Sequence, residues 1–253
     1  MDLPKDIYKG IFYFITKSED YSSVLLVCKT WNNFGYLYLD FSIDDNYPLK
    51  WATKYGSMSL LNKLLTLSGI DPSYDDQYAF RRAAACGHLQ IVAMLLEDPR
   101  VDPSANDQYA IRHACHNGHY DVVERLLLCD KIDPSAMLQL SLRSAASEGH
   151  LKIVALLLKD PRVDCSDAIQ NACQHGHYEV VALLLKDPRV DPSAEDQWVI
   201  RWACSKGYLD IVNLLLQDPR VDPLVNDYAA INAANSNGHI EIVRKIKRRY
   251  NLK

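Results

Sequence analysis

The densest group of chemically active side chains is the run His113, Cys115, His116 and His119. Imidazole and thiolate groups at such short spacing are ligands that zinc and related metals prefer. However, His119 follows a glycine and recurs at the same place along the chain, as His88, His150, His177 and His239. It is therefore a periodic, structural residue. His113 and His116 remain, three positions apart on one predicted helix and without a third ligand, so the sequence predicts no metal site and no cofactor.

Motifs of common catalytic sites are absent from the sequence. It contains no Gly-rich phosphate loop, no H-E-x-x-H pair, no C-x-x-C pair and no G-x-S-x-G elbow. A catalytic site needs one asymmetric group of residues, whereas most of this chain repeats itself. We therefore expect a protein that is not an enzyme. The enzymatic alternative predicts a deep polar pocket that holds a residue with a strongly shifted pKa.

The repetition is fixed by a column of glycines. Gly118 recurs at intervals of 31 residues, with one shorter interval of 27, as Gly56, Gly87, Gly149, Gly176, Gly207 and Gly238. A constant period of this size is the signature of a repeat array. One unit of about thirty residues buries too little apolar surface to fold alone, so neighbouring units must share a core.

Each unit reads as a hairpin of two short helices. Apolar residues at helical spacing lie on both sides of Gly118, which suits a left-handed residue at a helix C-terminus. Those residues are Ile111, Ala114, Cys115, Val122, Val123, Leu126 and Leu127. Asp107 is predicted to cap the first helix, as are Asp76, Asp196 and Asp227, and Pro99 is predicted to stop the second helix of the preceding unit. The array is therefore all-α.

The unit resembles an ankyrin repeat. The likeness lies in A-x-x-x-G-H (Ala114 to His119, Ala145 to His150), in the following V-V-x-x-L-L pattern, and in V-D-P-S-A at the place of the family's finger. The resemblance implies a helical solenoid that binds a partner along a concave face, made by the first helices and the fingers. Two features depart from the family: the unit is about two residues shorter than the usual period of about 33, and the T-P-L-H motif is changed. Arginines replace the histidine of the T-P-L-H motif in most units (Arg81, Arg112, Arg143 and Arg201), and the family builds its hydrogen-bond ladder on that histidine.

One unit is shorter than its neighbours. The segment 163–169 has lost four residues ahead of its first helix, so we expect a gap in the row of projecting loops. Such a gap could admit a protrusion of a partner, or it could be a tolerated loop deletion.

The N-terminal segment follows a different pattern. It opens on Leu3-Pro4, continues with Ile7 and Ile11 at helical spacing, and closes on V-C-K-T-W. This segment resembles an F-box, a cluster of three helices that packs on a Skp-type adaptor of a cullin-RING ubiquitin ligase. The resemblance places six residues at or beneath the adaptor surface: Leu3, Pro4, Ile7, Ile11, Cys28 and Trp31. The alternative is a helical cap that shields the first repeat.

Six side chains on the predicted first helices are candidates for contact with a target protein. They are Tyr78, Arg82, Tyr109, His113, Trp198 and Trp202. Aromatic residues and arginine dominate the hot spots of protein interfaces. Trp198 and Trp202 are four positions apart and therefore share one helix face. The alternative is that the tryptophans only cover the seam between two helices.

Composition bounds the remaining classes of function. The chain has 253 residues, a net charge of −4 and an odd number of cysteines, seven. This charge gives no reason to expect nucleic acid or an acidic membrane as partner. No apolar run is long enough to span a bilayer, and the start is no signal peptide. We expect a soluble, monomeric protein of the cytoplasm, with the nucleus as a second possibility. The charged last helix is interpreted as a cap, with nuclear import or nucleic-acid binding as the alternative.

Together these patterns predict an all-α protein: an F-box-like segment of three helices at residues 1–46, joined to an ankyrin-type solenoid of about seven units at 47–253. The resemblance implies a substrate-recruiting subunit of a Skp–cullin–F-box ligase, similar to proteins that giant viruses of amoebae encode in large families. The compartment is then the cytoplasm of the host cell. The alternative function is a scaffold or inhibitor whose N-terminal helices serve only as a cap.

Overall fold

The structure, a computed structural model, describes residues 46–66 and 70–252. Every regular element in these ranges is an α-helix, as predicted. The helices are α3 (Tyr47–Tyr55), α4 (Met58–Leu65), α5 (Tyr74–Ala85), α6 (Leu89–Glu97), α7 (Ala105–His116), α8 (Tyr120–Leu127), α9 (Ala136–Ser147), α10 (Leu151–Leu157), α11 (Ala168–Gln174), α12 (Tyr178–Leu184), α13 (Ala194–Lys206), α14 (Leu209–Leu215), α15 (Val225–Ser236) and α16 (Ile240–Arg249). The predicted three-helix segment lies outside the described residues.

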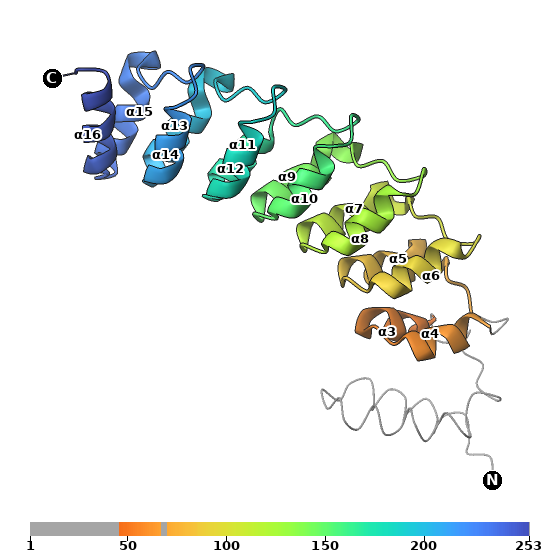
Figure 1. Cartoon of the computed structure of the whole chain (residues 1–253). Coiled ribbons are helices and arrows are strands. Elements are labelled where there is room, and N and C mark those ends of the chain that lie inside the picture. Colours follow the sequence, from red (N-terminus) through yellow and green to blue (C-terminus); the bar gives the residue numbers. More distant parts are fainter. Residues whose placement is uncertain (1–45, 67–69, 253) are drawn as a thin grey trace, which may run out of the picture.

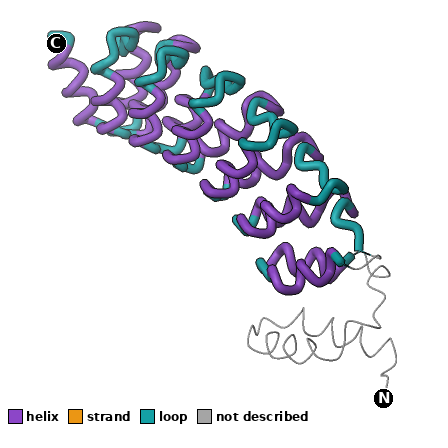
Figure 2. The backbone as a smooth tube through the Cα atoms, turned by 45° about the vertical axis from the view of Figure 1, so that its right-hand side comes forward, coloured by secondary structure: helices purple, strands orange, loops and turns teal. Residues whose placement is uncertain are grey.

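Successive helix pairs stack into a curved array (Figure 1). First helices pack on first helices, from α3 to α15, and second helices on second helices, from α4 to α16. The loops between units lie along the outer rim of the arc, and the turns inside the hairpins lie along the inner rim (Figures 1 and 2). The expectation that the loops help to form the concave face is therefore wrong.

The core is one continuous apolar column. The predicted stripes are confirmed, because Ile111, Val123 and Leu126 are buried, as are their equivalents in the other units except the half-buried Val243. Small residues fill the seam between first helices, among them Ala114, Cys115, Ala145, Ala146, Cys173 and Cys204. Each such residue lets two helix backbones approach closely. The interpretation of these cysteines as buried fillers is confirmed.

The hairpin turns join each unit to the next through a glycine and a histidine. Gly118 has φ 78°, the left-handed conformation that its position predicted. A Cβ at Gly118 would lie 2.6 Å from Cε1 of the His150 ring in the following unit. Nε2 of the same ring donates a hydrogen bond to the carbonyl oxygen of His116 at 2.8 Å. Glycine is therefore required here both for its backbone conformation and for the close approach of a ring.

This histidine contact forms a ladder along the inner rim. The ring Nε2 lies 2.7–3.1 Å from a carbonyl oxygen of the preceding unit in each case: His88 with Lys54, His119 with Ala85, His150 with His116, His177 with Ser147 and His239 with Ser205. The array thus keeps a ladder between its units although arginine has replaced the histidine of the family's T-P-L-H motif. A different histidine column, the one after the glycine, supplies it.

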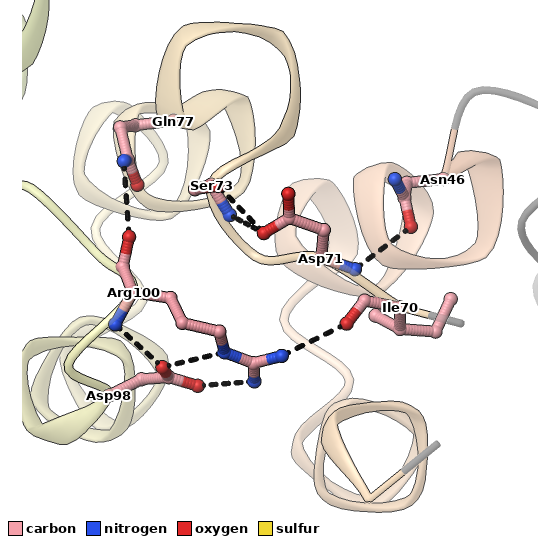
Figure 3. A network of polar contacts seen from close by, with 7 residues as sticks. All are labelled: Asn46, Ile70, Asp71, Ser73, Gln77, Asp98 and Arg100. Carbon is pink, nitrogen blue, oxygen red and sulfur yellow. Dashed lines mark hydrogen bonds and ion pairs between the residues drawn. The ribbon is translucent and has the colours of Figure 1, made fainter. Parts of the chain in front are cut away.

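The loops on the outer rim are held by a second network, in which arginine is the central residue (Figure 3). Arg100 pairs with Asp98 of its own loop through Nε and Nη2, at 2.9 and 2.6 Å. Its Nη1 donates to the carbonyl oxygen of Ile70 in the preceding loop, at 3.1 Å. From the other side, Gln77 Nε2 donates to the carbonyl oxygen of Arg100 at 3.4 Å. Each loop is therefore fixed to its own unit and to the one before it.

We call this arrangement the arginine latch: an arginine that pairs with the aspartate of its own loop and donates to a carbonyl oxygen of the preceding loop. It recurs in most loops and is missing from one. Arg162, Arg189 and Arg220 bind Asp160, Asp187 and Asp218 in the same way, and each donates to the preceding loop. In the loop between α8 and α9 the equivalent residues are Cys129 and Lys131. Within the described residues, the Lys131 side chain makes no hydrogen bond to the loop before it. Gln108, which donates to the Lys131 carbonyl oxygen at 3.2 Å, spans this step instead.

Each full-length unit enters its first helix through a left-handed turn that the sequence did not predict. Asn106, Asp107 and Gln108 all have φ between 54° and 62°. The prediction that Asp107 caps the helix is wrong, because this residue lies in the middle of that turn. Arg112 closes the turn, since its Nη2 donates to the carbonyl oxygen of Asn106 at 3.1 Å. Arg81 and Arg201 make the same bond to Asp75 and Glu195.

The short unit has no such turn. Its first helix, α11, begins at Ala168 directly after Asp167, and the backbone of 164–167 shows no left-handed residue. The predicted gap in the row of turns is therefore present between α9 and α13. Buried Ala172 and Cys173 keep the core continuous across it.

The two ends of the described array differ in character. On α16 only Ile242 and Ile246 are fully buried, while the side chains of Arg244, Lys245 and Arg248 are exposed. A terminal unit needs such a face because its outer side meets water.

None of the described helices combines the length and the apolar run that crossing a bilayer requires.

Candidate functional site

The exposed face of the first helices carries the six predicted contact residues. Tyr78 and Arg82 lie on α5, Tyr109 and His113 on α7, and Trp198 and Trp202 on α13. All six side chains are half-buried, so each is anchored by its neighbours and still presents an edge or face to solvent. The helices order the residues in two columns, because units stack in register.

On α7 the aromatic column forms a three-layer stack. The rings of Tyr109 and His113 are 3.8 Å apart and nearly parallel, at 21°. The guanidinium of Arg81, from α5, lies over the Tyr109 ring at 5.0 Å. Burial lowers the pKa of His113, and the nearby charges of Arg112, His116 and Arg81 lower it further. Both effects favour the neutral form of the His113 imidazole.

On α5 the column is occupied in a similar way. Lys50 Nζ, from α3, lies 5.0 Å from the centre of the Tyr78 ring and 5.3 Å from that of Tyr74. The same ammonium group pairs with Asp75 at 2.7 Å. This hydrogen bond lowers the pKa of Asp75. The two tyrosines thus hold cations that the array itself supplies.

On α13 the column contains two tryptophans. The rings of Trp198 and Trp202 are 5.1 Å apart and stacked at 11°. Lys206 Nζ lies 4.8 Å from the centre of the Trp202 ring. The indole N–H of Trp202 donates to the carbonyl oxygen of Gln174 at 3.4 Å. That carbonyl is the one that a histidine binds at other steps of the ladder, but here Tyr208 has replaced the histidine.

Trp202 therefore has a structural role as well as an exposed face. Its bond to Gln174 agrees with the alternative that the tryptophans cover a seam between helices. Trp198 makes no such bond within the described residues. Its ring stacks on that of Trp202 through one face of the indole.

The structure does not join the six residues into one patch. Tyr78, Arg82, Tyr109 and His113 lie on adjacent helices, whereas α9 and α11 separate them from the tryptophan pair (Figure 1). The intervening columns hold Leu140, Ser144, Asp167 and Asn171, which carry no aromatic ring. The face thus presents two aromatic clusters, one on α5 and α7 and one on α13.

Sequence reasoning missed the cations that cover the tyrosines. Lys50 and Arg81 each precede their aromatic partner by 28 positions, three fewer than the repeat period. A residue one helical turn from the aromatic column therefore reaches across to the next unit. Aligning the repeats and comparing positions 28 residues apart would have identified Lys50 as the partner of Tyr78 and Arg81 as the partner of Tyr109.

Most of the remaining shifted groups belong to the repeated framework. Burial raises the pKa of the thiols of Cys173 and Cys204 to about 12. Paired arginines lower the pKa of the loop carboxylates of Asp98, Asp160, Asp187 and Asp218. These shifts recur from unit to unit, as expected for groups that hold the stack together.

The histidine cluster of α7 is divided among different contacts. His119 belongs to the ladder, His113 stacks on Tyr109, and Nδ1 of His116 lies 3.7 Å from a carboxylate oxygen of Glu148. In the described ranges, no group of three or more histidine, cysteine, aspartate or glutamate side chains is arranged to hold a metal ion.

Comparison with known families gives a match over most of the described array. The family model described as ankyrin repeats (3 copies) matches residues 49–138, 82–168 and 142–227. These segments overlap and together span 49–227. No protein of curated function matches the chain.

Proposed function

The chain belongs to the ankyrin-repeat family, and from this premise we propose that it recruits substrates to a Skp–cullin–F-box ubiquitin ligase. Ankyrin repeats form protein–protein interaction modules, so the array binds a protein partner. In the proposal this partner is the target to be ubiquitinated. The N-terminal segment docks on a Skp-type adaptor.

The observation that carries the binding half is the face of the first helices. It holds two clusters of half-buried aromatic rings with cations over them. Hydrogen bonds along the inner and the outer rim of the array fix the helices that carry these rings. Rigid aromatic side chains lose little conformational entropy on binding, which makes them efficient anchors.

The sequence supports the adaptor half. The L-P start and the V-C-K-T-W ending of the first forty residues are the features that the F-box resemblance depends on. The residues proposed to contact the adaptor, Leu3, Pro4, Ile7, Ile11, Cys28 and Trp31, lie outside the described residues.

In this proposal the chain performs no chemistry of its own. Its contribution is proximity, because tethering a target lysine beside a charged conjugating enzyme raises the effective concentration of the lysine.

Co-purification tests the proposal directly. Full-length wild-type chain and a variant carrying Leu3→Ala and Trp31→Ala are used to capture a recombinant Skp-type adaptor. We expect the variant to lose the adaptor at least tenfold, whereas the matched control Trp198→Ala retains it. Equal capture by wild type and double variant would contradict the ligase role.

The second candidate function is a scaffold or inhibitor with the N-terminal helices as a cap. The hydrogen-bond networks of the inner and outer rims favour this function as much as the first one, because a rigid array can hold two proteins together without any ligase. It predicts that Leu3→Ala and Trp31→Ala lower the thermal stability of the first unit but change no adaptor binding.

We place the protein in the cytoplasm of a host cell, on the resemblance of its D-P-R-V-D-P-S-A repeats to those of giant viruses of amoebae. The basic face of α16 leaves import into the nucleus as the second compartment. Fluorescence microscopy of the tagged chain, with Lys247, Arg248 and Arg249 replaced by alanine as control, distinguishes the two. Light scattering tests the proposed monomeric state.

A further inference from the structure

Trp198 occupies a position where the other aromatic residues of its column carry a cation. Tyr78 is covered by Lys50 and Tyr109 by Arg81, at 5.0 Å in both cases. Lys50 and Arg81 are equivalent residues, each six positions before the glycine of its unit. The same contact therefore occurs twice: a cation on one first helix lies over an aromatic ring on the next first helix.

Trp198 has no such cation from the preceding first helix. The residue equivalent to Lys50 and Arg81 on the preceding helix, α11, is the neutral Gln170. Indole is the strongest cation acceptor among the aromatic side chains, so the best acceptor of the column lacks the partner that the weaker ones have. Lys206 does not replace it, because its ammonium group lies over Trp202.

The support for that cation is missing as well. Arg81 is held in place by the bond from its Nη2 to the carbonyl oxygen of Asp75, in the left-handed turn of its own unit. The short unit has lost this turn together with the arginine. The deletion therefore leaves Trp198 without the turn that, on α5, holds the cation over Tyr109.

The residue equivalent to Trp198 in the preceding unit carries a carboxylate. This residue, Asp167, directly precedes α11, the first helix that packs beside α13, and its side chain is exposed. Within the described residues its carboxylate accepts no hydrogen bond, and it does not cap α11. An aromatic face and an unused negative charge are thus brought together where four residues are missing.

We propose that Trp198 and Asp167 form a receptor for an arginine side chain of the bound partner. The guanidinium stacks on the free face of the Trp198 indole, in the place that Arg81 takes on Tyr109, and donates hydrogen bonds to the Asp167 carboxylate. Arginine is favoured over lysine because a planar guanidinium can stack and donate in its plane at once. This inference rests on the proposed protein-binding function and specifies one chemical feature of its target.

The test uses the four indole N–H signals of the ¹⁵N-labelled full-length chain, assigned with single Trp→Phe variants. The probes are two acetylated, amidated pentapeptides, Gly-Gly-Arg-Gly-Gly and the same peptide with neutral citrulline in place of arginine. We expect the arginine peptide to shift the Trp198 signal with an affinity roughly 5- to 30-fold higher than the citrulline peptide.

Three variants make the test specific. Gln170→Arg supplies the missing internal cation and should abolish the preference for arginine, while Asp167→Asn should reduce it several-fold. Asn232→Arg adds the same charge at the equivalent position of α15 and should change nothing. Dispersed amide spectra show that each variant is folded.

Equal shifts by the two peptides, no shift at Trp198 with the arginine peptide, or unchanged binding by Gln170→Arg would each overturn the inference. If the peptide test fails in one of these ways but the Gln170→Arg chain still captures the adaptor or a target protein, only the arginine receptor is contradicted and the proposed function stands. Loss of adaptor capture in the earlier experiment, with arginine preference intact, would contradict the ligase role alone.

Discussion

The inner and outer rims of the array hold the same units together by different physics. On the inner rim a histidine ring lies against a glycine of the preceding unit, so the contact depends on shape and on a left-handed backbone. On the outer rim an arginine pairs with an aspartate and reaches the preceding loop, and 38–47% of each arginine side chain stays exposed. The inner rim is therefore sterically strict, whereas the outer rim is electrostatic and tolerant.

The departures from the repeat follow this difference. All seven glycines are kept, even where Tyr208 replaces the ladder histidine. The outer rim, by contrast, has lost an arginine at Lys131 and four residues before α11. Variation is thus concentrated where a lost contact costs little, and the first-helix face next to the deletion is where we propose a binding site.

The strongest test of the comparison is substitution of the inner-rim glycine. Gly118→Ala should lower the free energy of unfolding by about 2–5 kcal/mol, since it adds left-handed strain and overpacking against His150. Gly238→Ala should cost only about 1–2 kcal/mol, because it has the same φ but no atom within 4 Å of the added Cβ. Urea denaturation measures both.

A double-mutant cycle separates the two costs of the glycine substitution. His150→Ala removes the ring that the new methyl group would meet, so Gly118→Ala in that background should lose only the backbone term. We expect a coupling energy of about 1–3 kcal/mol. A coupling near zero would show that the close approach of the ring is unimportant.

The next test compares two loops of the outer rim. Arg162→Ala should lower the free energy of unfolding by about 1 kcal/mol, because it removes the bidentate pair with Asp160 and the bond to Ile132. Lys131→Ala is the matched control and should stay within about 0.5 kcal/mol, since it forms no latch. Equal losses in the two variants would mean that the arginine latch adds no stability.

The inner rim and core were predictable from sequence because one rule governs every unit. Helical periodicity places Ile111 and Leu126 in the core, and the glycine column requires a left-handed turn whatever its surroundings. The predicted Asp107 cap failed because a cap and a left-handed turn favour the same residue types, and only tertiary packing of Gln108 and Arg112 decides between them.

The candidate site was predictable only in part. Residue type and spacing selected Tyr109, Trp198 and Trp202 and put each tryptophan on one face. The division into two clusters, and the hydrogen bond from Trp202 to Gln174, depend on how adjacent units are aligned in space. Single-helix periodicity carries no such information.

The outer rim should also respond to acid. The hydrogen bond from Arg162 lowers the pKa of Asp160, so this carboxylate stabilises the fold above its unfolded pKa of about 3.9. That contribution is lost as the pH falls through the lower folded value. The stability difference between wild type and Asp160→Asn should therefore shrink as the pH is lowered from 6 to 3.

Urea denaturation at several pH values measures this difference. Asp196→Asn is the matched control, because it makes the same substitution at an aspartate that forms no ion pair with an arginine within the described residues. A pH-independent difference for Asp160→Asn would show that the ion pair does not contribute to stability.

The smallest effect is expected from completing the missing latch. Cys129→Asp together with Lys131→Arg restores the residues that the other loops use and should raise the free energy of unfolding by about 0.5–1 kcal/mol. Cys129→Asp alone should be destabilising instead, because it places a half-buried carboxylate beside the core without its guanidinium partner. The change of sign on adding Lys131→Arg tests whether aspartate and arginine act as a unit. A double variant that is no more stable than wild type would show that the latch depends on further features of its loop, such as the proline that Asp130 replaces.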